Sequence, residues 1–361
     1  MIVRDEERYL DGCLASIASI VDEIVVVDTG SRDRSRDIAA AHGARVFEYE
    51  WRDDFAAARN AALDHATGDW VLYIDADERV RAYDRDRLCD ELRKPKLCAA
   101  TVRFYPQSGF TAYREYRLFR RLPTIRFRGA MHETIRPDLD RILRAGKGAC
   151  GPSDLAIDHL GYDEGRRRKA DRDLPLLQKE LLADPERVYL WWHLGVVYRE
   201  TGRMADAETA WMRGVDTVRR RGSDQPDAVL CHIELAKLRL QRGDDVTTLV
   251  DESLRLSPDN LLLLWLQARG LAVAGRHAAA IPVFARLGSV DPDTLLSDIS
   301  YDRRILGADA LAEAGYCAFL TGDYRQSEAW YRRAALLAPG RLEFSVKQRF
   351  AAARAHGAGQ G

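Results

Sequence analysis

Two carboxylates that directly follow a short apolar run point to metal and phosphate chemistry. Residues 70–74, Trp-Val-Leu-Tyr-Ile, are followed by Asp75, Ala76 and Asp77. An unbroken apolar run of this length is typical of a strand that is covered on both faces, as in a mostly parallel sheet between helices. In open α/β sheets, ligands bind beyond the carboxyl ends of the strands, so both carboxylates are expected at the mouth of a site.

These two side chains need a partner, because close carboxylates repel each other and lose hydration. A divalent cation relieves both problems. Mg²⁺ is usually held by one or two carboxylates together with the phosphates of a substrate. We therefore expect a metal ion and a phosphorylated ligand at this turn. The alternative is a solvated acidic turn, since the motif by itself is short.

The residues before this motif alternate between strand-like and helix-like segments. We expect strands at residues 1–3, 23–27, 45–49 and 70–74, and helices at residues 7–20, 34–42 and 55–66. Strands that alternate with helices imply crossover connections and a parallel sheet. The sequence thus predicts a Rossmann-like α/β domain with a mostly parallel sheet at residues 1–165, although the Gly-x-Gly-x-x-Gly signature of dinucleotide binding is missing.

The second half of the chain carries a different pattern. Trp191-x-x-Leu194-Gly195-x-x-Tyr198, followed by Ala207 and Trp211, fits the tetratricopeptide repeat. Weaker copies follow, with turns between helices expected at Gly202, Gly243, Gly275 and Gly322 and an insertion within residues 291–305. We expect an all-α repeat domain at residues 166–350, beginning with a leading helix at residues 169–182, and a flexible tail at residues 351–361.

Composition excludes several classes of function. The net charge of −1 gives no electrostatic footprint for a nucleic-acid partner. No apolar stretch is long enough for a membrane span, and no signal peptide is visible at the start. The six cysteines are scattered without a Cys-x-x-Cys pair, which argues against a structural zinc site or a disulfide framework. We expect a cytoplasmic location, whose reducing conditions suit such cysteines.

Several motifs in order resemble those of the family 2 glycosyltransferases with the GT-A fold. They are Met-Ile-Val-Arg-Asp-Glu-Glu at the start, Val-Val-Asp-Thr-Gly-Ser-Arg-Asp at 26–33, Asp-Asp-Phe at 53–55 with Ala-Arg-Asn at 58–60, Gly-Asp-Trp at 68–70 and Asp-Ala-Asp-Glu at 75–78. Three later segments, at 117–120, 129–133 and 159–162, are similar to the branch that carries tetratricopeptide repeats. In that branch several apolar residues precede the first motif. We expect that the true start lies upstream of Met1, with a shortened first strand as the alternative.

The resemblance implies roles for donor-binding residues. Asp28 is implied as a partner of the base or ribose, and it can also cap the following helix. Arg4 and Arg59 are implied to hold the uracil or the diphosphate, since Arg suits bidentate phosphate contacts; the alternative is a surface ion pair. Asp75 is expected at the ribose or at a metal-bound water. Asn60 is expected to cap or pack rather than to touch the ligand.

The resemblance also implies the catalytic and metal-binding residues. Glu133 is the expected general base that takes the proton of the acceptor. Asp77 is the expected direct metal ligand, with Asp75 beside it. His159 is our choice to complete the shell of the cation, ahead of His132, although an isolated histidine is more often structural.

We thus expect a metal-dependent, inverting glycosyltransferase that uses a nucleotide sugar together with Mg²⁺ or Mn²⁺. The expected donor is a UDP-sugar. The acceptor is expected to be a peptide or protein side chain (S- or O-glycosylation), with a cell-envelope or lipid-linked glycan as the alternative. The repeats present a concave surface that suits such an acceptor, or that pairs two copies of the chain as a homodimer. A nucleotidyltransferase is disfavoured because residues 1–7 contain neither Gly nor Lys. The remaining alternative is a non-catalytic repeat scaffold with a relic nucleotide-binding domain.

Overall fold

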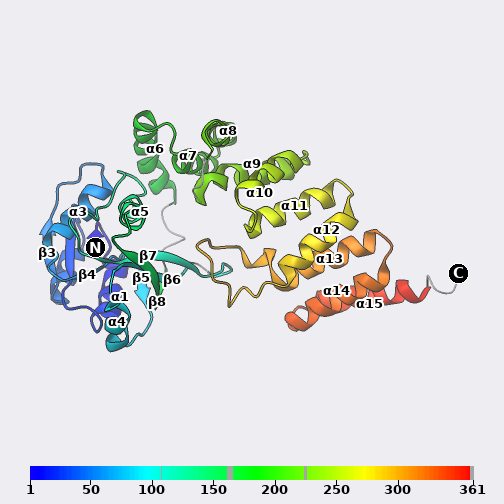
Figure 1. The fold of residues 1–361 in the computed structure, drawn as a ribbon, viewed down its shortest axis with the longest axis horizontal. Helices are drawn as coiled ribbons and strands as arrows, with labels where there is room; N and C mark the ends of the chain where they lie inside the picture. Colours follow the sequence, from blue (N-terminus) through cyan, green and yellow to red (C-terminus); the bar gives the residue numbers. More distant parts are fainter. Residues whose placement is uncertain (107, 161–165, 223–225, 358–361) are drawn as a thin grey trace. The chain divides into compact units, whose positions relative to one another are not determined.

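A computed structural model describes residues 1–106, 108–160, 166–222 and 226–357 (Figure 1). The chain forms two compact units. Each unit also includes one short segment from the half of the sequence that mainly forms the other unit. The first unit comprises Met1–Ser108, Ala112–Leu176 and Leu296–Ser300, and the second comprises Gly109–Thr111, Leu177–Leu295 and Tyr301–Gly361. The main boundary therefore lies inside helix α6 (Arg166–Ala183), eleven residues after the predicted position.

The first unit begins with the predicted alternation of strands and helices. Its first elements are β1 (Ile2–Val3), α1 (Glu7–Ile17), β2 (Val25–Asp28), α2 (Ser35–Ala41), β3 (Arg45–Glu48) and α3 (Phe55–His65). The three strands pair in parallel in the order β1-β2-β3. Gly43 ends α2 in a left-handed conformation, as its position after the helix predicted.

The second sheet is mixed, and here the prediction of a mostly parallel sheet is wrong. Its strands are β4 (Trp70–Leu72), β5 (Glu78–Val80), β6 (Leu97–Tyr105), β7 (Tyr113–Arg120) and β8 (Ala149–His159), in the order β4-β7-β6-β8-β5. Only β6 and β8 pair in parallel, whereas β4 with β7, β6 with β7 and β5 with β8 are antiparallel. The short connection from β6 to β7 permits no crossover helix, and so it forces an antiparallel pair.

Helices cover both faces of the sheets, which produces two apolar cores. One core joins the sheets to α1, α2 and α4 (Arg85–Leu92) and includes Leu10, Val26 and Leu88. The other joins them to α3 and α5 (Arg136–Arg144) and includes Leu63 and Phe119. The candidate site residues Asp28 and Asp75 lie at or after the carboxyl ends of β2 and β4, where ligands bind in open α/β sheets.

The second unit consists of helix pairs, as the repeat pattern predicted (Figure 1). Its helices are α7 (Val188–Glu200), α8 (Met204–Arg221), α9 (Leu230–Arg242), α10 (Thr247–Leu256), α11 (Leu261–Val273), α12 (His277–Gly288), α13 (Gly307–Leu320), α14 (Tyr324–Leu337) and α15 (Leu342–Gly357), with short 3₁₀ turns at Pro226–Val229 and Arg303–Ile305. The four glycines predicted at turns have positive φ angles between 73° and 81°. The predicted insertion is the irregular stretch between α12 and α13. No described helix has the length and apolar character that crossing a membrane requires.

The predicted flexible tail is helical over most of its length. Helix α15 continues to Gly357, and Ala351 is fully buried. The stretch Ala-Ala-Ala-Arg-Ala is a strong helix former, and Phe344 anchors the same helix in the core of the last repeat. The prediction took the small residues of this tail as a sign of flexibility and overlooked the helix propensity of alanine. Residues 358–361 lie outside the described chain.

We predict that Gly195→Ala destabilises the second unit. A Cβ atom at this position in α7 would lie inside the van der Waals distance of the indole ring of Trp211, which is fully buried. Overpacking of this kind costs about 1–3 kcal/mol, whereas the better helix propensity of alanine returns only about 1 kcal/mol. Thermal unfolding followed by circular dichroism at 222 nm should show a lower Tm. Gly340→Ala, where no atom lies within 4 Å of the added Cβ, is the matched control; equal Tm values for both variants would contradict the packing argument.

Candidate active site

Asp28 ends β2, and its carboxylate closes the turn that follows the strand. The predicted role as a helix cap is wrong, because α2 begins at Ser35 and no described side chain caps it. Its Oδ1 accepts hydrogen bonds from the backbone N–H groups of Gly30 (3.0 Å) and Ser31 (2.9 Å). Its Oδ2 is buried and has no hydrogen-bond partner in the described structure. A buried acceptor without a donor is costly, and it fits a ligand that brings a hydroxyl or N–H group. The geometry therefore leaves room for the predicted contact with a base or ribose.

The loop after β1 is braced against the loop after β2. The backbone N–H groups of Asp5 and Glu6 donate to the hydroxyls of Ser31 (3.0 Å) and Ser35 (2.8 Å). Sequence reasoning missed these two serines, although both lie in or beside the Thr-Gly-Ser motif. The side chain of Arg4 is exposed next to this braced edge. Its predicted role in donor binding stays a prediction.

Arg59 connects the Asp-x-Asp motif to the candidate base. It lies on α3 and is buried, with 9% of its surface exposed. Its Nη2 donates to Asp75 Oδ1 (2.9 Å) and its Nε donates to Glu133 Oε1. The alternative of a surface ion pair is therefore wrong for Arg59. Its Nη1 is buried without a hydrogen-bond partner, and it remains available for a ligand oxygen.

A second buried arginine holds the turn after β4. The Arg117 guanidinium, on β7, donates through Nη2 to Glu78 Oε1 (2.7 Å) and through Nη1 to Oε2 (3.2 Å). Glu78 in turn accepts the backbone N–H of Asp75 at 2.9 Å. Sequence reasoning did not assign these two residues, although the segment 117–120 and the Asp-Ala-Asp-Glu motif contain them.

Burial and charge act in opposite directions on these carboxylates. Burial alone would raise the pKa of Asp75, but the positive charges of Arg59 and Arg117 outweigh it and hold this pKa at about 2. Burial raises the pKa of Glu78 to about 7 despite the opposing charge of Arg117. Asp75 is thus ionised at neutral pH, whereas Glu78 takes up its proton well above the ordinary range of a carboxylic acid.

Asp77 and His159 meet at the other side of the same turn. The His159 Nε2 lies 3.1 Å from Asp77 Oδ2, and both side chains are about one-fifth exposed. The antiparallel pairing of β5 with β8 brings them together, since the Leu160 N–H donates to the carbonyl of Asp77 (2.8 Å). Within the described ranges, no three His, Cys, Asp or Glu side chains are grouped so that they alone could hold a metal ion.

The donor set still fits a metal that shares its ligands with a substrate. A carboxylate and an imidazole are ordinary ligands of a divalent cation, and Mg²⁺ or Mn²⁺ completes its shell with substrate phosphates and water. The predicted trio separates into two parts, because Asp75 is engaged by Arg59 while Asp77 pairs with His159. Asp75 as a direct metal ligand therefore stays a prediction that would need rearrangement of the Arg59 contact.

Glu133 lies in a tight loop whose ends pair through Arg128 and Thr134. His132, next to it, adopts a left-handed backbone with φ of 51°. Asn60 on α3 fixes the segment that enters this loop, because its amide exchanges two hydrogen bonds of 2.9 Å with the backbone of Phe127. Asn60 thus makes structural contacts, while its lack of contact with a ligand stays a prediction. The loop carries Glu133 to Arg59.

We predict that stability depends on pH through Glu78. Since its folded pKa lies above the ordinary value of 4.5, the folded protein keeps this proton at pH values where the unfolded chain has lost it. The stabilising contribution is complete below about pH 4.5 and disappears as the pH rises toward 7. Relative to Glu78→Gln, the wild type should lose roughly 2–3 kcal/mol of unfolding free energy over that window.

Urea unfolding at pH values from 4.5 to 7.5 measures this difference. Glu48→Gln, which changes a carboxylate with 77% exposure, should track the wild type. Parallel profiles of the wild type and Glu78→Gln would mean that Arg117 keeps Glu78 ionised over the whole window, and the argument would be wrong.

Comparison with known proteins agrees with this fold. Residues 1–144 match the model of Glycosyl transferase family 2. A TPR repeat-containing protein of Synechococcus elongatus is 38% identical over 255 residues, which cover 68% of this chain and 62% of that protein. The SPbeta prophage-derived glycosyltransferase SunS of Bacillus subtilis (strain 168) is 29% identical over 262 residues, which cover 70% and 61%. The chain thus spans about three fifths of the length of these relatives.

Among solved structures, the TPR protein YrrB is similar over 51% of this chain and 85% of its own, at 15% identity and a TM-score of 0.40, which is too distant to inform the function. The family match covers most of the first unit, and SunS extends the similarity beyond it. Residues 1–144 of this chain are therefore similar to glycosyltransferase family 2, and the chain as a whole is also similar to a TPR repeat-containing protein.

Proposed function

We propose that the chain transfers a sugar from a nucleotide sugar to an acceptor, in a metal-dependent reaction that inverts the anomeric carbon. The observation that carries this proposal is the bridge that Arg59 makes between Asp75 and Glu133. One guanidinium holds the Asp-x-Asp motif beside the carboxylate that is best placed to act as a base. A relic domain has no need of such a buried bridge, and this favours an enzyme over the non-catalytic scaffold.

Charge supports the need for a metal. The carboxylates of Asp75, Glu78, Glu115 and Glu133 outnumber the two guanidinium groups that they contact. A diphosphate brings further negative charge into this region, and a divalent cation offsets it. Asp77 and His159 would hold Mg²⁺ or Mn²⁺. The ion, when bound, supplies stabilisation of the departing diphosphate.

The residues of the chain then divide the remaining tasks. Asp28 Oδ2 would accept a hydrogen bond from the base or ribose, for which uridine is our proposed nucleoside. Arg59 Nη1 would donate to an oxygen of the donor, and Arg4 would approach the diphosphate from the exposed edge. Glu133 would take the proton of the acceptor as it attacks, which is the usual contribution of a positioned carboxylate.

For the acceptor we propose a peptide or protein side chain, modified on sulfur or oxygen. Helical repeats stack into an extended concave surface, and such a surface suits a chain-like acceptor better than a small sugar. A cell-envelope or lipid-linked glycan is the competing acceptor. A cytoplasmic location and a homodimer through the repeats belong to the same proposal.

We predict that Asp77→Asn abolishes metal-dependent donor binding. Loss of one charged ligand should weaken the binding of UDP in the presence of Mn²⁺ or Mg²⁺ by at least about 100-fold, as measured by calorimetry. Asp90→Asn, which removes a carboxylate of similar type from the exposed face of α4, is the control and should bind as the wild type does. Binding that is equally strong with chelator and with metal in the wild type would rule out the metal.

We predict that Glu133→Gln separates binding from chemistry. The release of nucleotide from a panel of UDP-, GDP- and dTDP-sugars, with water as acceptor, should fall about 10²–10⁴-fold. The affinity for UDP should change by no more than about threefold, because the amide keeps one oxygen that accepts from Arg59. An unchanged rate would remove Glu133 from the mechanism. If the wild type hydrolysed none of the donors and bound no nucleotide, the hypothesis of a non-catalytic repeat scaffold would be favoured.

A further inference from the structure

Three loops at one end of the second sheet carry many cations and no carboxylate. They comprise residues 92–97 before β6, residues 119–128 around the end of β7, and residues 141–149 before β8, and none of them contains Asp or Glu. The net charge of the whole chain is −1, so composition alone does not produce such an excess of one sign. Loops of this kind on a nearly neutral protein favour an anionic partner.

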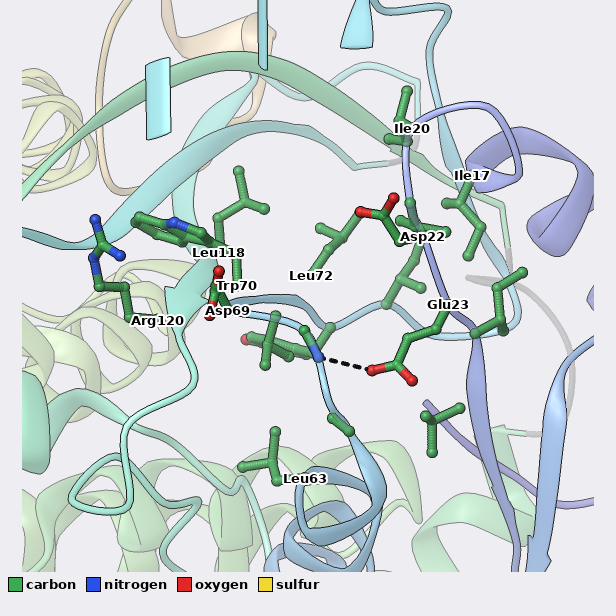
Figure 2. Close-up of a pocket in the computed structure, with 18 of the residues that line it drawn as sticks. Ile17, Ile20, Asp22, Glu23, Leu63, Asp69, Trp70, Leu72, Leu118 and Arg120 are labelled. Carbon is green, nitrogen blue, oxygen red and sulfur yellow. Dashed lines mark hydrogen bonds between the residues drawn. The ribbon is translucent and has the colours of Figure 1, made fainter. Parts of the chain in front are cut away.

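Hydrogen bonds join the three loops into one edge of the first unit. The Ala149 N–H donates to the Lys96 carbonyl (2.7 Å), and the Arg120 Nε donates to the Leu97 carbonyl (2.7 Å). Figure 2 shows Arg120 beside the indole of Trp70, with 4.9 Å from Cζ to the ring centroid, at one side of a pocket of about 590 Å³. Since β6 pairs with both β7 and β8, cations from all three loops lie along the same end of the sheet.

Some cations of these loops are neutralised by carboxylates from neighbouring segments. Arg93 pairs with Asp90, and Arg128 and Arg141 both pair with Asp138. The other exposed cations of the loops form no ion pair with any described residue; they are Lys94, Lys96, Arg121, Arg144 and Lys147. We call these five residues the basic edge. Their charges are available to a partner outside the chain.

Two leucines project between these cations. Leu122 and Leu143 are each 37% exposed. Leu122 lies in the turn after β7, where its carbonyl accepts the Ile125 N–H (3.0 Å), and Leu143 precedes Arg144 in the last turn of α5. Exposed apolar side chains among lysines and arginines are typical of surfaces that enter the headgroup region of a bilayer.

We propose that the basic edge binds the surface of an anionic lipid bilayer, with Leu122 and Leu143 in the headgroup region. Each Lys or Arg close to an anionic leaflet strengthens binding by about fivefold. Three of the five cations are lysines. A lysine carries a point charge on a flexible stem, which suits a diffuse layer of negative charge.

An acidic protein explains these features less well. Recognition of fixed carboxylates favours the planar fork of arginine, but the Arg121 guanidinium is already engaged by the carbonyls of Thr67 and Gly68. A nucleic acid is disfavoured as well, because single-stranded nucleic acids stack their bases on exposed aromatic rings. The aromatic residues of the three loops, Phe119 and Phe127, are buried.

The basic edge lies away from the candidate active site. Strand β8 begins at Ala149 in this edge and ends at His159 in the site, which separates them by roughly 30 Å at ~3.3 Å per residue. A bilayer in contact with the basic edge therefore leaves His159 accessible from the aqueous side. Binding to lipid is a further property of the chain and does not require sugar transfer.

The experiment measures sedimentation of the full chain with vesicles at about 0.1 M salt. We expect vesicles of phosphatidylcholine with phosphatidylglycerol to bind the chain at least about tenfold more tightly than phosphatidylcholine alone. Lys94→Glu combined with Lys147→Glu should weaken binding to the anionic vesicles by at least about 25-fold. The matched control is Lys179→Glu combined with Arg213→Glu, which makes the same change of net charge at exposed cations of α6 and α8 and should bind as the wild type does.

A second pair of substitutions tests the leucines. Leu122→Ser combined with Leu143→Ser should weaken binding to the anionic vesicles by at least about threefold, because the two side chains no longer enter the headgroup region. Tm values from circular dichroism should match the wild type for all variants, since every substituted side chain is exposed.

Two results would overturn the proposal directly. One is a wild type that binds anionic and neutral vesicles equally or not at all, and the other is an equal loss of binding in both charge-reversal variants. Polyglutamate that binds the wild type as tightly as the vesicles do, with vesicle binding unchanged by the leucine substitutions, would assign the basic edge to an acidic protein instead. If the chain binds anionic vesicles but no UDP, the lipid-binding edge stands and the proposed function fails.

Discussion

Two buried guanidinium groups determine the geometry of the candidate site. Arg59 and Arg117 are each less than one-tenth exposed, and both lie close to the ring of Tyr73, with 5.3 and 4.5 Å from Cζ to the ring centroid. A buried charge without a partner costs several kcal/mol. Each arginine therefore needs its carboxylates, and each carboxylate is fixed where a guanidinium can reach it. Asp75 lies within reach of both, and so the turn after β4 has its shape before any ligand arrives.

This constraint divides the residues of the site into two groups. The carboxylates that face Arg59 and Arg117 hold the turn after β4 in place, whereas Asp77 contacts His159 and the Oδ2 atom of Asp28 has no hydrogen-bond partner in the described structure. Ligand binding then needs little rearrangement at the second group. The first group supplies preorganised charge, which is worth more in a site of low dielectric constant than in water. A ligand oxygen at Arg59 Nη1 would be the point where the two groups meet.

The sequence predicted elements well where local chemistry decides them. Glycines with positive φ mark the turns between the repeat helices, and the buried run of β2 follows from its three valines. Contacts between distant residues could not be predicted in this way. The spacing of Asp75 and Asp77 does not reveal that the two side chains take different partners, because α3 supplies Arg59 and β8 supplies His159. The mixed sheet has the same origin, since pairing partners of β4 lie more than forty residues later in the chain. No local pattern in residues 70–78 contains that information.

Strand β1 is connected to the candidate site through Thr29. The Val3 carbonyl accepts hydrogen bonds from both the N–H and the hydroxyl of Thr29, directly after Asp28. A two-residue strand holds this connection with few hydrogen bonds, and short edge elements are the parts of a protein that open most easily. Opening of β1 would also displace the loop at Asp5 and Glu6, whose backbone N–H groups bond to Ser31 and Ser35. The order of the loop after β2 is therefore coupled to the pairing of β1 with β2.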